Sequence, residues 1–230
     1  MPVGAIALTE SGEILSSTPV GLVDSHGAIR SPLPPAGSDI RANDGKPDPA
    51  GRFVSGTMSV GDPRAGAGSL WSMQGASAAE LVESATIANG LAWSPDHDTL
   101  FWIDTPLGRV DAFDYDLATG QVSNRRVHVE INPEWGSPDG MCIDVEGRLW
   151  VALWGGSAVR CFDGANCVEI IEVPTPLVTC PTFAGPSLDQ LVITTASIGD
   201  TNPAPEAGAL YCVSPGTSGE RPHRLGAWAG

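Results

Sequence analysis

Residues 89–104 read NGLAWSPDHDTLFWID, and the same plan recurs at residues 43–58, NDGKPDPAGRFVSGTM, and at residues 139–154, DGMCIDVEGRLWVALW. Each stretch opens on Asn or Asp close to a Gly, continues as a strand-like run, turns through Pro, Asp or Gly, and enters a second strand. The opening residues of successive stretches lie 46 and 50 residues apart. A repeat of this length built from short strands is typical of a β-propeller, with one blade per repeat.

The opening residues Asn43, Asn89 and Asp139 occupy the same position in the three repeats. Because equivalent positions of successive blades meet near a propeller axis, we expect these side chains to converge on one central site. A second interpretation stays open, because Asn or Asp before Gly is also a common turn former that tolerates positive φ and hydrogen-bonds its own backbone.

The rest of the chain follows the same strand-and-turn pattern, and helical periodicity is nearly absent. Residues 3–30 predict two or three strands, and the five predicted units are residues 3–30, 43–87, 88–132, 138–180 and 181–230. We therefore predict an all-β protein, a single β-propeller domain over residues 1–230 with about five blades.

Composition narrows the class of partner. The chain has 230 residues, 42% of them hydrophobic, and a net charge of -15, which argues against nucleic acid and against an anionic membrane as partners. No apolar stretch approaches the ~20 residues of a membrane span, and no leader pattern follows Met1. Five cysteines without a CxxC pair predict buried, reduced thiols rather than a zinc site. A cytoplasmic location is expected.

Longer motifs carry a resemblance to a known family. RANDGKPDPAGRFVSGTM at residues 41–58, NGLAWSPD at 89–96, VDAFDYDLATGQVSNRR at 110–126 and PDGMCIDVEGRLWVA at 138–152 are long, collinear and distinctive. Together they resemble the regucalcin and gluconolactonase family, to which the luciferin-regenerating enzyme also belongs. The resemblance runs from about Val3 to the end of the chain.

The resemblance implies a six-bladed propeller with one divalent metal at the centre of one face. By motif, it implies that Asn89 and Asp139 are metal ligands, with Asp139 also the catalytic residue. It further implies that Asn43 and Arg41 contact the substrate. The implied activity is that of a lactonase, a carboxylic ester hydrolase acting on a small-molecule sugar lactone.

The chain also departs from the family pattern. The family's third metal ligand is a glutamate in a Glu-Gly-Pro segment of the first blade, and no Glu-Gly-Pro occurs in this sequence. We expect a chain that lacks the first blade to bind metal weakly, to hydrolyse lactones poorly, and to self-associate through unpaired strand edges. A non-catalytic calcium- or ligand-binding propeller and a truncated, inactive fragment are the alternatives.

A second departure concerns the loop before the strand that contains Trp71. Family members often carry an acidic substrate contact there, whereas this loop, GDPRAGAG at residues 61–68, has Asp62 as its sole acid. A different substrate preference follows as an expectation.

The chemistry of the predicted site can be read from its residue types. One carboxylate and one or two amide oxygens suit Ca²⁺, Mg²⁺ or Mn²⁺, with Zn²⁺ less favoured. A cation there would polarise a lactone carbonyl, and Asp139 would accept a proton from the attacking water. Arg41 would hold sugar hydroxyls or the developing carboxylate.

Other candidate groups have simpler explanations. Asp96, His97 and Asp98 look like a solvated turn rather than part of a catalytic triad. Asp111, Asp114 and Asp116 alternate with the apolar residues of a strand, and we expect all three to face solvent. The tryptophans of the strand-like runs are expected to pack between blades; they are Trp71, Trp93, Trp102, Trp150 and Trp154.

Overall fold

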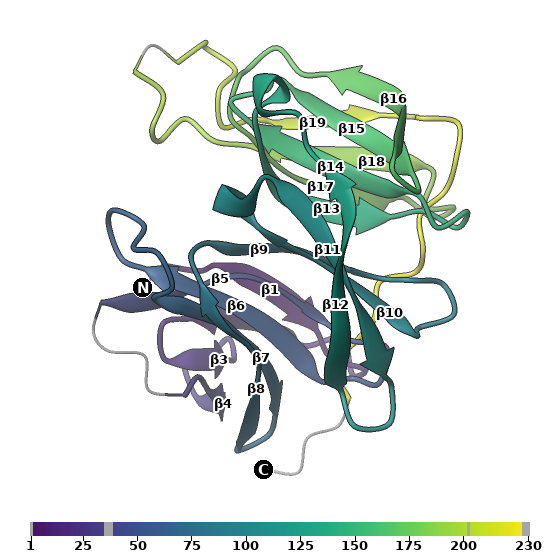
Figure 1. Cartoon of the computed structure of the whole chain (residues 1–230). Helices are drawn as coiled ribbons and strands as arrows, with labels where there is room; N and C mark the ends of the chain where they lie inside the picture. The colour runs from purple at the N-terminus through teal and green to yellow at the C-terminus, as the bar shows by residue number, and fades with distance from the viewer. Residues whose placement is uncertain (1, 35–38, 202, 227–230) are drawn as a thin grey trace. The chain divides into compact units, whose positions relative to one another are not determined.

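The computed structural model describes residues 2–34, 39–201 and 203–226. Within these residues the secondary structure is almost entirely β, and two short 3₁₀ turns, η1 (Thr105–Leu107) and η2 (Pro133–Trp135), are the exceptions. The strands form five antiparallel sheets in which neighbours in sequence are neighbours in space (Figure 1). The fold is that of a β-propeller with five blades, which confirms the predicted fold class and blade count.

The chain divides into two compact units. The first unit comprises residues 1–89, 114–123 and 222–230, and the second comprises residues 90–113 and 124–221. The tip of one hairpin, residues 114–123, is thus grouped with the first unit although the rest of its sheet lies in the second. The prediction of one domain over the whole chain stays a prediction.

The first unit contains two four-stranded sheets, ordered β1-β2-β3-β4 and β5-β6-β7-β8. Their strands are β1 (Ala5–Leu8), β2 (Ile14–Thr18), β3 (Gly21–Val23), β4 (Ile29–Pro32), β5 (Ile40–Pro47), β6 (Phe53–Ser59), β7 (Gly68–Gln74) and β8 (Ser77–Ala85). Residues 3–30 were predicted to supply two or three strands, and this was wrong by at least one. The missed strands are short, because Gly-rich turns leave only three or four residues between them.

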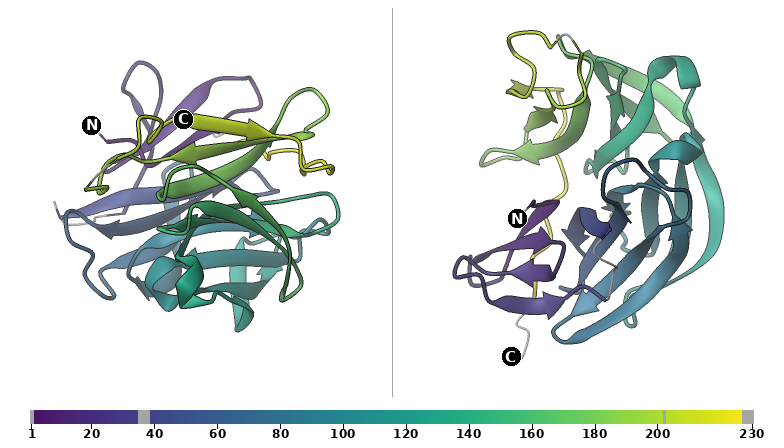
Figure 2. Two further views of the ribbon diagram at one scale, coloured as in Figure 1. Left: turned by 90° about the horizontal axis from the view of Figure 1, so that it is seen from above. Right: turned by 90° about the vertical axis from the view of Figure 1, so that its left-hand side faces the viewer.

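The core of the first unit joins both of its sheets to the C-terminal segment. Leu15, Leu22, Phe53 and Met73 pack in one cluster with Leu225. The backbone of Leu225 also pairs with the end of β1, because its N–H donates to the carbonyl of Leu8 at 2.8 Å. Figure 2 shows this yellow segment running beside the purple strands of the first sheet. The end of the chain therefore stabilises its beginning.

The second unit contains the sheets β9–β12, β13–β16 and β17–β19, apart from the hairpin tip named above and from Ala88 and Asn89 of β9, which belong to the first unit. Their strands are β9 (Ala88–Trp93), β10 (Thr99–Asp104), β11 (Arg109–Asp116), β12 (Gln121–Glu130), β13 (Ser137–Ile143), β14 (Leu149–Trp154), β15 (Ala158–Asp163), β16 (Asn166–Glu172), β17 (Val178–Ala184), β18 (Gln190–Thr195) and β19 (Leu210–Val213). Two apolar clusters hold these sheets, one centred on Met141 and Leu149 and the other on Trp150 and Phe183.

Two of the predicted strand-to-strand turns are closed by a buried carboxylate. In the first unit, Asp48 accepts hydrogen bonds from the backbone N–H groups of Ala50 and Arg52, from Nε of Arg52, and from the hydroxyl of Tyr115. Arg52 continues the network by donating to the carbonyls of Leu117 and Ala118 in the tip of the β11–β12 hairpin. The turn DPAGR therefore locks that hairpin tip onto the end of β5.

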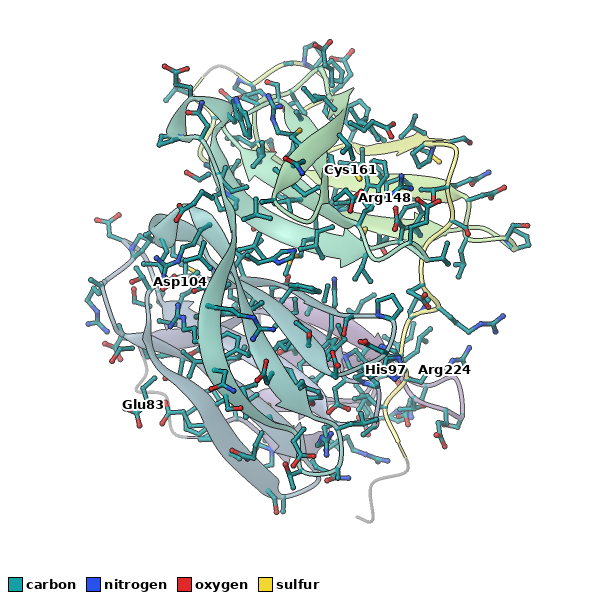
Figure 3. All side chains as sticks on the ribbon, turned by 45° about the vertical axis from the view of Figure 1, so that its right-hand side comes forward. Glu83, His97, Asp104, Arg148, Cys161 and Arg224 are labelled. Atoms are coloured by element: carbon teal, nitrogen blue, oxygen red, sulfur yellow. The ribbon has the colours of Figure 1, made fainter. Side chains whose placement is uncertain are left out.

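The turn DVEGR of the second unit uses the same arrangement. Asp144 is completely buried and accepts from the N–H groups of Glu146 and Arg148, from Nε of Arg148 at 2.8 Å and from Nε1 of Trp150 at 3.0 Å. Figure 3 shows Arg148 close to Cys161 on the sheet β13–β16. Burial raises the pKa of the Cys161 thiol to about 12, so this cysteine is an unreactive part of the core.

Two expectations about polar residues need correction. Asp111 was predicted to face solvent, but it is 2% exposed and forms ion pairs with Arg109 and Arg125. Asp114 and Asp116 do face solvent, as predicted. Asp111 is an odd number of residues from Asp114 and Asp116, so strand alternation places it on the opposite face of β11. It can be buried there because it is paired with two arginines. The cysteines were expected to be buried and reduced; all five are free thiols, but Cys212 is exposed.

Candidate functional site

The three Asx residues of the repeats lie inside strands rather than in turns. Asn43 is in β5, Asn89 in β9 and Asp139 in β13, each the first strand of its sheet in chain order. The pairing register shifts between Ala42 and Gly45, and again between Pro138 and Met141. These irregularities are β-bulges, which redirect side chains and occur often beside functional sites. The turn interpretation of the Asx-Gly pairs is therefore wrong.

The glycines of the motifs are required by space and not by a left-handed backbone. Neither Gly90 nor Gly140 has positive φ. A Cβ atom added to Gly90 would lie 2.7 Å from the carbonyl oxygen of Asp139, and one added to Gly140 would lie 2.5 Å from the sulfur of Cys180. Both contacts join the first strands of neighbouring sheets in the second unit. Gly at these positions lets those strands approach closely.

The same close approach shows which positions of the repeats are equivalent. The carbonyl of Asp139 faces Gly90, the carbonyl of Asn43 faces Gly4, and the carbonyl of Thr179 faces Gly140. Sequence reasoning missed Thr179, because the fifth repeat has no Asx-Gly pair and was taken to begin at Pro181, whereas β17 begins at Val178. Its hydroxyl lies 2.6 Å from that of Thr194.

Three predicted site residues of the first unit are joined by hydrogen bonds. Nη1 of Arg41 donates to Oδ1 of Asn43 at 2.9 Å, and Nδ2 of Asn43 donates to Oδ1 of Asn89 at 3.1 Å. Nδ2 of Asn43 also donates to the carbonyl of Ala88 at 3.1 Å, which fixes the amide between two strands. The predicted convergence is therefore confirmed for Asn43 and Asn89, which are 46 residues apart.

Asp139 belongs to the second unit, and its convergence with the other two stays a prediction. Its side chain is partly buried. The strand that carries it is held by Thr105, whose hydroxyl donates to the carbonyl of Pro138 at 2.8 Å. The bulge and this hydrogen bond fix the backbone on the N-terminal side of the carboxylate.

A further carboxylate at the same bulge was not singled out from the sequence. Oδ1 of Asp44 accepts from the N–H of Gly45 at 2.7 Å, while Oδ2 is buried without a hydrogen-bond partner. Desolvation raises the pKa of Asp44, and the nearby charge of Lys46 opposes that rise only in part. A buried, unsatisfied carboxylate beside Asn43 is the kind of group that functional sites retain at the cost of stability.

The donor set fits a hard divalent cation in ligand type. No group of three or more His, Cys, Asp and Glu side chains able to hold a metal exists among the described residues. The residues predicted to supply ligands are instead Asn89, through its amide oxygen, and Asp139, through its carboxylate. Oxygen donors of this kind suit Ca²⁺, Mg²⁺ or Mn²⁺ better than Zn²⁺, which prefers His and Cys.

The remaining candidates from the sequence do not form sites. Asp96, His97 and Asp98 lie in the turn between β9 and β10, where the hydroxyl of Ser94 donates to Asp96. This confirms the solvated-turn prediction. The five tryptophans expected to pack between blades all lie on strands, and Trp93, Trp102 and Trp150 are buried. The packing expectation is wrong for Trp154, which is 36% exposed. Among the described residues, no helix has the length and apolar character to cross a membrane.

Fold and site together define a β-propeller in which polar side chains project from bulges in the first strands of its sheets. Comparison with known proteins places this propeller in a family. Residues 1–197 match the family described as SMP-30/Gluconolactonase/LRE-like region. The chain belongs to that family, which confirms the resemblance found in its motifs.

Individual relatives agree with the family assignment. Regucalcin of Danio rerio is 40% identical over 184 residues, which make up 76% of this chain and 62% of that protein, so the match spans less than two thirds of its length. Regucalcin of Xenopus laevis is 34% identical over 229 residues, covering 93% of this chain and 77% of that protein. The crystal structure of a calcium-binding protein, regucalcin, from Agrobacterium tumefaciens has a TM-score of 0.87 at 29% identity, covering 96% and 78% of the two chains.

Proposed function

We propose that this protein hydrolyses a sugar lactone to the open-chain aldonic acid with a divalent cation as cofactor. The family supports a lactonase-type activity, because gluconolactonase is part of its description. The observation that carries the proposal is the hydrogen-bonded set of Arg41, Asn43 and Asn89. It brings one guanidinium group and two side-chain amides of the first unit together.

The proposed roles follow from the chemistry of each group. Asn89 and Asp139 would supply ligands to the cation, whose contribution when bound is to polarise the lactone carbonyl. Asp139 would also accept a proton from the attacking water as general base. Asn43 holds the amide of Asn89 in orientation, and Asn43 and Arg41 would orient the sugar. Cytoplasmic location and the absence of nucleic-acid and membrane partners stay predictions.

A direct test is a pH-indicator assay of D-glucono-1,5-lactone hydrolysis by the chelator-treated protein, with Ca²⁺, Mn²⁺, Mg²⁺ or Zn²⁺ added back one at a time. We expect activity to require added metal, and Asp139→Asn to lower kcat/KM by about 10²–10³-fold through loss of the base and a ligand charge. Asp163→Asn is the matched control, because Asp163 is an exposed carboxylate of the same unit. Equal rates for Asp139→Asn and the parent would show that the site assignment is wrong.

A second candidate function is calcium binding without catalysis. The oxygen-only donor set favours it as much as it favours hydrolysis, and a structural relative is described as a calcium-binding protein. Calorimetric titration with Ca²⁺ separates the two. Binding that Asp139→Asn abolishes, in a protein that turns over no lactone, would establish the binding function and exclude the hydrolase.

A further inference from the structure

Arg41 differs from Arg52 and Arg148, two other arginines that are shielded from solvent, in having no carboxylate partner among the described residues. Arg52 and Arg148 are each neutralised by a buried carboxylate, at 2.5 Å and 2.8 Å. Arg41 is also partly buried, yet no carboxylate of the described residues forms an ion pair with it. Its protein partners are two neutral oxygens, the carbonyl of Ala42 and Oδ1 of Asn43.

Both of these hydrogen bonds use the same nitrogen of the guanidinium. Nη1 donates to Ala42 at 3.0 Å and to Asn43 at 2.9 Å, and no acceptor among the described residues engages Nε or Nη2. The edge formed by Nε and Nη2 presents two parallel N–H groups, the geometry that binds both oxygens of a carboxylate. Arg41 is therefore anchored by one nitrogen and presents an unused bidentate edge.

Partial burial without a counter-ion is energetically unfavourable for the charged guanidinium of Arg41. The desolvation of the Arg41 guanidinium is not offset by an ion pair, because its hydrogen-bond partners are neutral oxygens. The loop between β6 and β7 does not compensate, because its acid, Asp62, is exposed and its side chain makes no hydrogen bond with the described residues. A bound anion would compensate the positive charge of Arg41.

The location of this edge ties it to the proposed lactone site. Arg41 bonds Asn43, and Asn43 bonds Asn89, the proposed metal ligand. A group bound on Nε and Nη2 of Arg41 would thus belong to the same small molecule as the reacting carbonyl.

We propose that the substrate is the lactone of a sugar dicarboxylic acid, an aldarolactone, whose free carboxylate binds the Nε–Nη2 edge of Arg41. This inference rests on the proposed lactonase function and specifies its substrate class. In the reaction, water adds to the lactone carbonyl and the ring C–O bond breaks, so that the ring oxygen becomes a hydroxyl group of the product. The acyl carbon becomes a second carboxylate, and one proton is released. The carboxylate on Arg41 is unchanged throughout.

Two lactones that differ only at carbon 6 form a matched pair for the test. D-Glucaro-1,4-lactone carries a carboxylate at carbon 6, where D-glucono-1,4-lactone carries a neutral hydroxymethyl group. We expect the parent protein to show a kcat/KM at least ~10-fold higher for the glucarolactone, consistent with one charge-assisted bidentate contact. Equal kcat/KM values, or a preference for the neutral lactone, would overturn the proposal.

Variants of Arg41 locate the source of that preference. Arg41→Gln should reduce the preference for the glucarolactone by about 10-fold or more, and Arg41→Lys should restore part of it, because a lysine keeps the charge and loses the fork. Arg30→Gln is the matched control, because it removes the same charge from a side chain that is 50% exposed in the same unit. An equal loss of activity on both lactones in Arg41→Gln would contradict a carboxylate-binding role.

A binding measurement keeps this inference separate from the lactonase proposal. Calorimetric titration of the Asp139→Asn variant with each lactone should show ~10-fold tighter binding of the glucarolactone, and Arg41→Gln in that background should abolish the difference. Equal binding of the two lactones would overturn the inference. If the parent hydrolyses neither lactone yet shows this difference, the carboxylate subsite stands and the lactonase proposal fails.

Discussion

Asp44, within strand β5, and Asp48, directly after it, differ in how their carboxylates are hydrogen-bonded. Asp48, at the turn, is fully buried, and both of its oxygens accept hydrogen bonds from Arg52, Tyr115 and the backbone. Asp44, four residues earlier at the bulge, has one oxygen buried without any partner. The same residue type is therefore fully hydrogen-bonded in the turn after β5 and partly unsatisfied at the bulge within β5. Satisfaction of hydrogen bonds, rather than burial, distinguishes the two roles.

The second unit has a fully hydrogen-bonded turn carboxylate like that of Asp48. Asp144 has the same backbone contacts and the same arginine four residues later, and Nε1 of Trp150 replaces the hydroxyl of Tyr115 as the third partner. Arrangements that recur with a changed third partner are a property of the fold. The unsatisfied oxygen of Asp44, by contrast, is tied to the bulge where Asn43 and the proposed substrate site lie.

The largest expected effect on stability comes from removing the hydrogen-bonded carboxylate of Asp48. Asp48→Ala leaves the guanidinium of Arg52, a residue only 8% exposed, without its carboxylate, and should lower the free energy of unfolding by about 3–5 kcal/mol. Urea unfolding followed by tryptophan fluorescence measures it. Asp62→Ala, an exposed carboxylate in the same unit, is the control and should change stability by less than about 0.5 kcal/mol. A loss below about 1 kcal/mol in Asp48→Ala would show that the hydrogen bonds of Asp48 are not needed.

A smaller change sharpens the comparison by removing one hydrogen-bond partner of Asp48. Tyr115→Phe deletes the hydroxyl that donates to Oδ2 of Asp48, while Arg52 remains. Because hydrogen bonds to charged groups contribute about 1.5–3 kcal/mol, we expect a loss of unfolding free energy in that range. Burial and the same hydrogen bond raise the pKa of Tyr115, so its phenol should not ionise at moderately alkaline pH. The difference between ultraviolet titrations of the parent and Tyr115→Phe separates this phenol from that of Tyr211, and a difference signal near pH 10 would contradict the hydrogen bond.

The smallest effect on stability, and one of opposite sign, is expected from changing Asp44, whose Oδ2 has no hydrogen-bond partner. Desolvation raises the pKa of Asp44 in the folded protein, so the native state binds this proton more tightly than the unfolded chain. The contribution of Asp44 to stability is therefore fully present below the unfolded pKa of about 3.9 and is lost as the pH rises through the folded pKa. Asp44→Asn should thus stabilise the protein at pH 7 by about 1 kcal/mol, and the gain should shrink as the pH is lowered.

Urea unfolding of the parent and Asp44→Asn at pH 5 and pH 7 tests this prediction. The matched control is Asp62→Asn, which makes the same chemical change at an exposed position of the same unit. If Asp44→Asn were less stable than the parent at pH 7, the ionised carboxylate of Asp44 would be stabilised in the native state. The difference between Asp44 and Asp48 would then disappear.

Much of the fold was predictable from the repeats. Strand-forming runs separated by Pro, Asp and Gly turns gave the five blades and nearly all strands of the units after residue 43, because alternation and turn chemistry are local properties. The first unit was underestimated because β3 and β4 are too short for a clear periodic pattern. Asp111 was misplaced because strand alternation puts it on the opposite face from Asp114 and Asp116, where Arg125 of the neighbouring strand pairs with it.

The candidate site was predictable only in part. Asn43 and Asn89 were correctly expected to meet, because a repeat places equivalent residues at equivalent positions. The bulges were not predictable, since an Asx-Gly pair has the same local signature in a turn and in a bulged strand. Thr179 and the unsatisfied oxygen of Asp44 gave no sequence signal, because both are defined by what lies around them.

The sequence by itself determined the class of fold, the number of blades and the residue types available for a hard-cation site. These depend on turn chemistry, strand alternation and repeat spacing, all of which act within a few dozen residues. Only the tertiary structure decided which carboxylates are satisfied and that Arg41 has no carboxylate partner among the described residues. Those properties depend on groups brought together from distant strands, where desolvation and hydrogen bonding set the cost of each charge.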